Sequence, residues 1–158
     1  LVELPNGDFA FTVVRRVLFD AYHGLLLERL SRAGDADIAA IAAKSKKEVD
    51  YHRRHSADWV IRLGDGTEES HRRAQSALDA MWKYTHELFV SDAVDPEAGT
   101  LREPWLAEVS RILSEATLAL PPEGKFVSHG RQGVHSEHLA YLLAEMQVLH
   151  RAHPGARW

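Results

Sequence analysis

The 158-residue sequence contains no cysteine. This absence excludes disulfide bonds, zinc or iron–sulfur sites with thiolate ligands, and catalysis by a cysteine nucleophile. The sequence also lacks a signal-peptide pattern and any apolar run of about 18 residues, the length that a membrane-spanning helix requires. A cytosolic location without membrane binding is therefore the default expectation.

An excess of basic charge is missing as well, because 19 lysine and arginine residues are balanced by 23 aspartate and glutamate residues, for a formal net charge of −4. This balance argues against nucleic acid as a partner. The chain length and the 45% of hydrophobic residues are ordinary for one soluble domain that buries its own core. We therefore expect residues 1–158 to form a single domain.

An initiator methionine is absent too. The chain opens with LVELPNGDF, in which apolar residues directly precede a turn signal. This beginning is typical of an interior segment of a longer polypeptide, and we expect that an N-terminal portion of the protein is missing.

Helical periodicity dominates the sequence, and no window shows the sustained period-two alternation of a strand. Helix N-caps are expected at Asn6 or Asp8, at Asp35, and at Asp65 or Thr67. The predicted helices cover residues 9 to about 33, 36–63, 68 to about 89, 104–116, and about 136 onward. Long antiparallel helices joined by short connections predict an all-α helical bundle.

Apolar stripes indicate which side of each helix is buried. The first helix should bury Phe9, Val13, Val17, Asp20, Gly24 and Leu27. The second should bury Ile38, Ile41, Ser45, Val49, His52, Ser56, Trp59 and Leu63. The last should bury Leu139, Leu142, Leu143, Met146 and Leu149.

Ionisable residues interrupt the stripes of the first two helices. Arg16 and Asp20 lie in the first helix, and Glu48 and His52 lie in the second. Burying a charge is costly unless it is paired or binds a metal, so these groups are expected to meet. They could form a metal site, with His55 on the same face, or a hydrogen-bonded ion network that fills the space of a lost metal site.

The metal interpretation has a specific template. Helical-bundle di-iron proteins combine a carboxylate on one helix with a Glu-x-x-His motif on the next. Asp20 corresponds to the single carboxylate and Glu48 to the glutamate of the motif, but Tyr51 occupies the histidine position. His52 comes one residue later, which rotates its side chain by about 100° around the helix. We therefore interpret Asp20, Glu48 and His52 as a degenerate remnant and predict the ion network.

A second polar cluster precedes the last helix. The segment HGRQGVHSEH contains His129, Arg131, His135, Glu137 and His138. The three histidines His129, His135 and His138 could bind zinc, or Arg131 with Lys125 could contact an anionic group on a partner or on coenzyme A. Alternatively, Ser136 and Glu137 are simply favourable first-turn residues of the last helix.

Three long stretches carry a family resemblance. They are LPNGDFAFTVVRRVLFDAY, IAAKSKKEVDYHRRHSADWVIRLGDGTEESHRR and HGRQGVHSEHLAYLLAEMQVLHRAHPGARW. These stretches resemble the PaaC-type subunit of the ring-1,2-phenylacetyl-CoA epoxidase, the oxygenase complex of phenylacetate degradation. The resemblance extends over essentially the whole chain.

This resemblance implies a ferritin-like bundle whose N-terminal helices are missing here. It further implies that a related catalytic oxygenase subunit holds a di-iron centre, and that NADPH, FAD and an iron–sulfur cluster belong to a reductase subunit. PaaC-type subunits lack a competent iron-ligand set, so no residue of this chain is expected to be catalytic or to bind a cofactor. The expected role is a structural partner of the catalytic subunit within the epoxidase complex, with a homodimer as a further possibility. The alternatives are a di-iron oxygenase in its own right and a helical interaction module unrelated to oxygenation.

Overall fold

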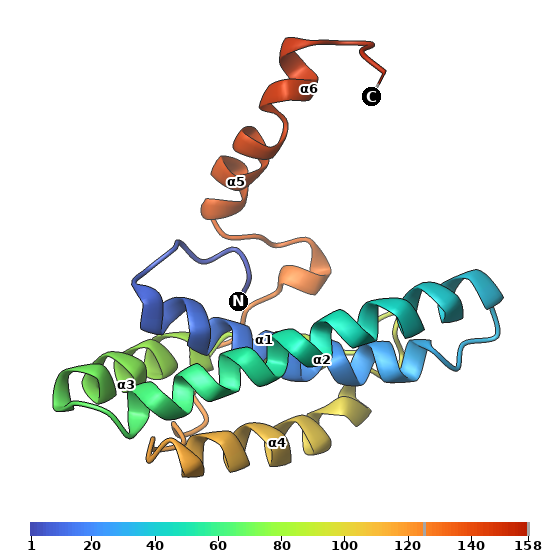
Figure 1. Ribbon diagram of the computed structural model, residues 1–158. Helices are drawn as coiled ribbons and strands as arrows, with labels where there is room; N and C mark the ends of the chain where they lie inside the picture. Colours follow the sequence, from blue (N-terminus) through green and yellow to red (C-terminus); the bar gives the residue numbers. More distant parts are fainter. Residues whose placement is uncertain (125, 158) are drawn as a thin grey trace.

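The structure is a computed structural model that describes residues 1–124 and 126–157. It confirms the all-α prediction: the described residues form helices and loops, with one isolated β-bridge between His129 and Val134. The elements are α1 (Phe9–Leu30), α2 (Ala36–Gly64), α3 (Glu68–Trp82), η1 (Thr85–Phe89), η2 (Ala98–Leu101), α4 (Arg102–Glu115), η3 (Gly130–Gln132), α5 (His138–Met146) and α6 (Val148–Ala152). Figure 1 shows α1 and α2 as an antiparallel pair, with α3 beside one end and α4 along one side.

Side-chain caps fix the beginnings of the first three helices, as predicted. Asp8 accepts a hydrogen bond from the backbone N–H of Phe11 at 2.9 Å. Asp35 accepts two backbone hydrogen bonds at the start of α2. Thr67 and Ser70 form a reciprocal capping box at the start of α3, which satisfies N–H groups that a helix leaves unpaired.

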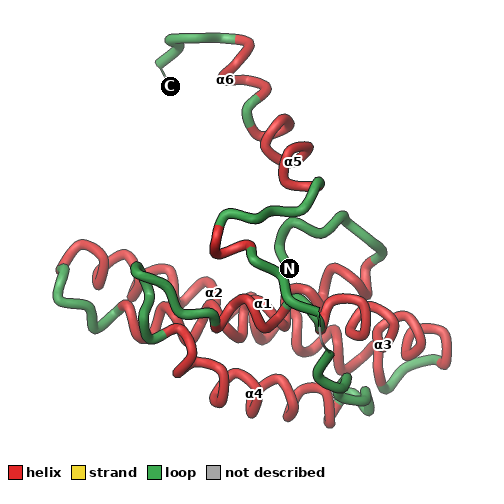
Figure 2. The backbone as a smooth tube through the Cα atoms, turned by 180° about the vertical axis from the view of Figure 1, so that it is seen from behind, coloured by secondary structure: helices red, strands yellow, loops and turns green. Residues whose placement is uncertain are grey.

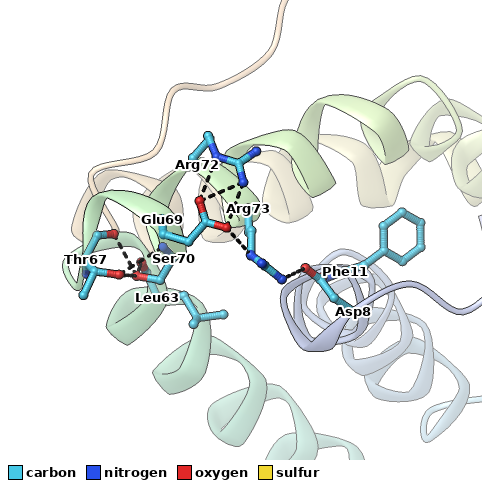
Figure 3. A network of polar contacts seen from close by, with 8 residues as sticks. All are labelled: Asp8, Phe11, Leu63, Thr67, Glu69, Ser70, Arg72 and Arg73. Carbon is cyan, nitrogen blue, oxygen red and sulfur yellow. Dashed lines mark hydrogen bonds and ion pairs between the residues drawn. The ribbon is translucent and has the colours of Figure 1, made fainter.

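The capping box also closes the turn between α2 and α3 (Figure 3). The hydroxyl of Ser70 donates to the carbonyl of Leu63 at 2.7 Å, near the end of α2. Next to it, Glu69 pairs with Arg72 and Arg73, and Arg73 also reaches Asp8 at the start of α1, 3.3 Å away. One exposed ionic cluster therefore joins the beginnings of α1 and α3.

The core lies where α1 meets α2, α3 and α4. Fully buried side chains come from all four helices and include Leu18, Val60, Leu78, Met81, Val109 and Ile112. Trp105 on α4 stacks on Trp82 with ring centroids 5.5 Å apart, and its indole N–H donates to the carbonyl of Leu18 at 2.9 Å. The apolar positions predicted for α4 are buried, so this helix matches its expected stripe.

The stripe predicted for α2 is partly wrong. Ile38 and Ile41 are 47% and 66% exposed. The side chains of α2 that are buried are instead Ala42, Val49, Ser56, Ala57, Val60 and Gly64. The bundle selects a face of small residues because α1 packs closely along it, and this rotates the larger isoleucines outward.

The C-terminal arm, defined as α5 and α6, departs most from prediction. Figures 1 and 2 both show it extending away from the bundle. No described residue of α5 or α6 is buried, so the prediction that the last helix packs inward is wrong. The residues expected in that inward stripe, from Leu142 to Leu149, face solvent.

Candidate functional site

Asp20 is the buried charge that the sequence indicated. Its residue is 5% exposed, and one carboxylate oxygen accepts a hydrogen bond from Nε of Arg16 at 3.1 Å. The two residues are one helical turn apart, so α1 alone supplies this pair. The predicted contact between Arg16 and Asp20 is confirmed.

Glu48 and His52 do not join this pair. Glu48 is exposed, although the next residue, Val49, is buried against α1 at 6% exposure. Because one residue turns the helix by about 100°, Glu48 faces solvent where Val49 faces the core. Within residues 1–124 and 126–157, no hydrogen bond or ion pair connects Glu48 or His52 to Asp20. The predicted four-residue network is therefore wrong.

A different ionic chain links the helices. Lys46 lies 3.7 Å from Glu28 on α1 and 2.5 Å from Asp50 on its own helix. Arg53 lies 3.9 Å from Asp50 and pairs with Glu108 on α4 at 3.1 Å. Alternating charges thus connect α1, α2 and α4 along one side of the buried face of α2.

Sequence reasoning missed this chain although a signal was present. Lys46, Asp50 and Arg53 follow each other at spacings of four and three, which places them on one helical face. They flank the small residues Ala42 and Val49, which are buried. An apolar stripe assigned from the isoleucines hides this signal, because it places the ionic face one residue away.

The histidines and carboxylates do not converge into a metal-ligand set. In the part of the chain that the structure describes, no group of three or more histidine, aspartate or glutamate side chains is placed to hold a metal ion. Tyr51, at the position of the motif's histidine, is 58% exposed and stacks on His55 with ring centroids 6.2 Å apart. Asp20, Glu48 and His52 therefore do not fit a di-iron site.

Arg131 lies in a built polar site. Its Nε and Nη2 donate to the same carboxylate oxygen of Asp92 at 3.1 and 2.9 Å, and its Nη1 donates to the carbonyl of Leu88 at 3.2 Å. The phenol oxygen of Tyr22 is 3.5 Å from Nη1. Burial alone would lower the pKa of Arg131, but the hydrogen bond to Asp92 outweighs it and raises that pKa.

The same site holds the loop after η1. The other carboxylate oxygen of Asp92 accepts the backbone N–H groups of Val94 and Asp95, which, together with Arg131, lowers the pKa of Asp92. Asp95 in turn accepts a hydrogen bond from Arg29 on α1 at 2.6 Å. Arg131 is thus committed to partners within this chain. Lys125, its expected companion, lies outside the described residues.

The start of the arm is held by contacts to the N-terminal segment. His135 lies 2.6 Å from Glu3, and Ser136 donates both its backbone N–H and its hydroxyl to Glu3. Ser136 therefore does not cap α5, and Glu137, which precedes α5, makes no side-chain capping bond. The expectation that these two residues serve the first turn is corrected. Burial works against ionisation of Glu3, yet these hydrogen bonds lower its pKa.

The arm itself carries a cluster of exposed apolar side chains. Their exposed fractions range from 39% to 72%, for Tyr141, Leu142, Leu143, Met146, Val148 and Leu149. Soluble proteins rarely expose a contiguous apolar patch of more than a few hundred Å², and larger patches mark interaction sites. The arm is therefore the candidate interface of the molecule.

Comparison with known proteins identifies the family. A family model described as phenylacetic acid catabolic protein matches residues 1–158. The chain belongs to this family. It is 45% identical to the C subunit of 1,2-phenylacetyl-CoA epoxidase from Escherichia coli (strain K12) over 169 aligned positions, which span 100% of this chain and 67% of that relative.

Family membership confirms the resemblance seen in the sequence and places the chain in phenylacetate catabolism. It also gives the all-α bundle and the exposed arm a context, because the family relative is one component of a larger enzyme. Within the described residues, no helix combines the length and apolar character needed to cross a membrane.

Proposed function

We propose that this chain is a structural, non-catalytic, PaaC-type component of a phenylacetyl-CoA 1,2-epoxidase and that it supports the di-iron catalytic subunit of that complex. The 45% identical relative is described as a component of this epoxidase, and the match includes the whole of this chain. In this proposal the iron belongs to the catalytic subunit, whereas NADPH, FAD and the iron–sulfur cluster belong to the reductase subunit.

The position of Glu48 is the observation that carries the proposal. A di-iron site in this bundle would need Glu48 to point between the helices toward Asp20. Instead Glu48 is exposed, and the carboxylate of Asp20 is paired with Arg16. Moving Glu48 inward would require α2 to rotate by about 100°, which would expose Val49 and separate the Lys46–Glu28 contact.

The test is co-expression of the full-length PaaC-type protein with the catalytic subunit, followed by iron analysis and by assay of phenylacetyl-CoA epoxidation. We expect the catalytic subunit to be active only in the complex, and the purified PaaC-type protein to contain no stoichiometric iron. A Glu48→Ala complex should keep its activity within about twofold, because an exposed carboxylate holds no metal. About two irons in the isolated PaaC-type protein, lost together with activity in Glu48→Ala, would support the alternative of a di-iron oxygenase in its own right.

A further inference from the structure

We propose that the C-terminal arm is the element by which this chain binds the catalytic subunit, with α5 lying in an apolar groove between helices of that partner. This inference rests on the proposed function and specifies the surface involved. The residues that carry the contact are Leu139, Leu142, Leu143 and Met146 on α5, followed by Val148 and Leu149 on α6.

The arm is too short to be stable by itself. α5 has 9 residues and α6 has 5, and no described residue of either is buried. Isolated helices of fewer than about 12 residues are marginal in water, since most helical stability in proteins comes from packing an apolar face. A helix with 72% of Tyr141 and 72% of Met146 exposed therefore needs a surface to pack against.

The spacing of the apolar residues suits a groove. Leu139, Leu142, Leu143 and Met146 recur at intervals of three, four and seven along α5. This is the pattern by which an amphipathic helix fits its apolar face into a groove between two helices. Gln147 separates α5 from α6, and Leu149 continues the apolar surface beyond this break.

The start of the arm is fixed before any partner binds. Arg131 is bound to Asp92, and Ser136 is bound to Glu3. Ser128 also donates its hydroxyl to Glu87 at 2.7 Å. These contacts hold the segment that leads into α5 against the bundle, which reduces the entropy lost when the arm docks.

A second copy of this bundle offers no suitable groove. Among the described residues of the four bundle helices, the large apolar side chains that are exposed are Phe9 on α1 and Ile38, Ile41 and Tyr51 on α2. The exposed large apolar residues in the described part of the chain include none from α3 or α4, so no pair of neighbouring helices frames an apolar groove away from α1 and α2. Two arms packed on each other would bury far less than the roughly 800 Å² per partner of a standard interface. A different helical protein of the complex is therefore the occupant.

The experiment uses the full-length, tagged PaaC-type protein, co-expressed with the catalytic subunit. The arm variant is Leu142→Asp with Met146→Asp. Two matched controls introduce aspartate elsewhere: Val94→Asp, at a loop residue that is 95% exposed, and Ile41→Asp, on the outer face of α2. Measurements are the amount of catalytic subunit retained per tagged protein, the mass of the tagged protein by itself in solution, and hydrogen exchange of residues 138–152 with and without the catalytic subunit.

We expect the arm variant to retain at least about tenfold less of the catalytic subunit, while both controls retain as much as the wild type. The arm amides should exchange fast in the PaaC-type protein by itself and at least about tenfold more slowly in the complex. Equal retention by the wild type and the arm variant would overturn the docking inference and leave the proposed function standing. Failure of the wild type to retain the catalytic subunit would overturn the proposed function itself.

Two further outcomes would assign the arm to another occupant and so contradict the inference. A mass change from dimer to monomer in the arm variant alone would show that a second copy covers the arm. Slow exchange of the arm in the full-length PaaC-type protein without its catalytic partner would show that the same chain covers it.

Discussion

At the scale of single residues, the polar side chains of this protein mainly bind one another. Asp20 binds Arg16, Asp92 binds Arg131, and Glu87 accepts the hydroxyl of Ser128. Pairing within the chain offsets the cost of removing these charges from water. The residues that looked catalytic by type thus contribute to structure.

His23 on α1 makes the stability of the protein depend on pH. Burial lowers the pKa of His23 below its ordinary value of 6.5, and the nearby charge of Asp20 opposes this only in part. The unfolded chain therefore takes up this proton at a higher pH than the folded chain, so stability falls as the pH decreases below 6.5. We expect urea unfolding at pH 7.5 and 5.5 to show a smaller loss of stability in His23→Gln than in the wild type.

The comparison between those two pH values isolates the histidine. Glu3 and Glu87 also have lowered pKa values, but unfolded glutamate titrates near 4.5, so their contributions are lost in more acidic solution. An equal loss of stability in the wild type and in His23→Gln would show that another group controls this range.

At the scale of elements, the sequence predicts four of the helices well. The starts of three of them are marked by Asp8, Asp35 and Thr67, whose side chains act locally on the next turn of backbone. The inward face of α2 was harder to predict, because Ile38 and Ile41 are larger and more apolar than the residues that are buried. Small residues such as Ala42 are selected by the close approach of α1, and this tertiary requirement leaves no local signal.

Gly64, the last residue of α2, tests this close packing. A Cβ atom at this position would lie 2.0 Å from the carbonyl oxygen of Ala116 and 2.9 Å from its Cβ. The backbone after α4 would have to move, so we expect Gly64→Ala to destabilise the protein by about 1–3 kcal/mol. Gly34 is the matched control, because a Cβ there meets nothing within 4 Å.

Gly34→Ala should change stability by less than about 0.5 kcal/mol. Chemical denaturation of both variants measures the difference, with the slope of the transition checked for constancy. Similar stabilities of the two variants would contradict the tight contact between the end of α2 and Ala116.

At the scale of the whole molecule, the sequence predicts the fold class and the family but not the arrangement of the arm. The apolar residues of α5 have the same helical periodicity as those of a buried helix, and periodicity alone does not say whether the surface they cover belongs to the same chain. The ionic chain from Glu28 to Glu108 is lost for a related reason, since it joins residues from three helices whose packing has no local signature.

Deleting the arm should leave the bundle intact. In the full-length protein shortened to end at Ser136, the melting temperature should change by less than about 2 °C, because the deletion removes no buried residue of α5 or α6 and keeps the Ser136–Glu3 contact. A chain ending at Gly124 also loses the Arg131–Asp92 and Ser128–Glu87 contacts, so it should melt several degrees lower. Calorimetry of both truncations separates the two segments. A fall of about 8 °C or more on removing the arm alone would mean that α5 packs on its own bundle, and the arm could then not be a free docking element.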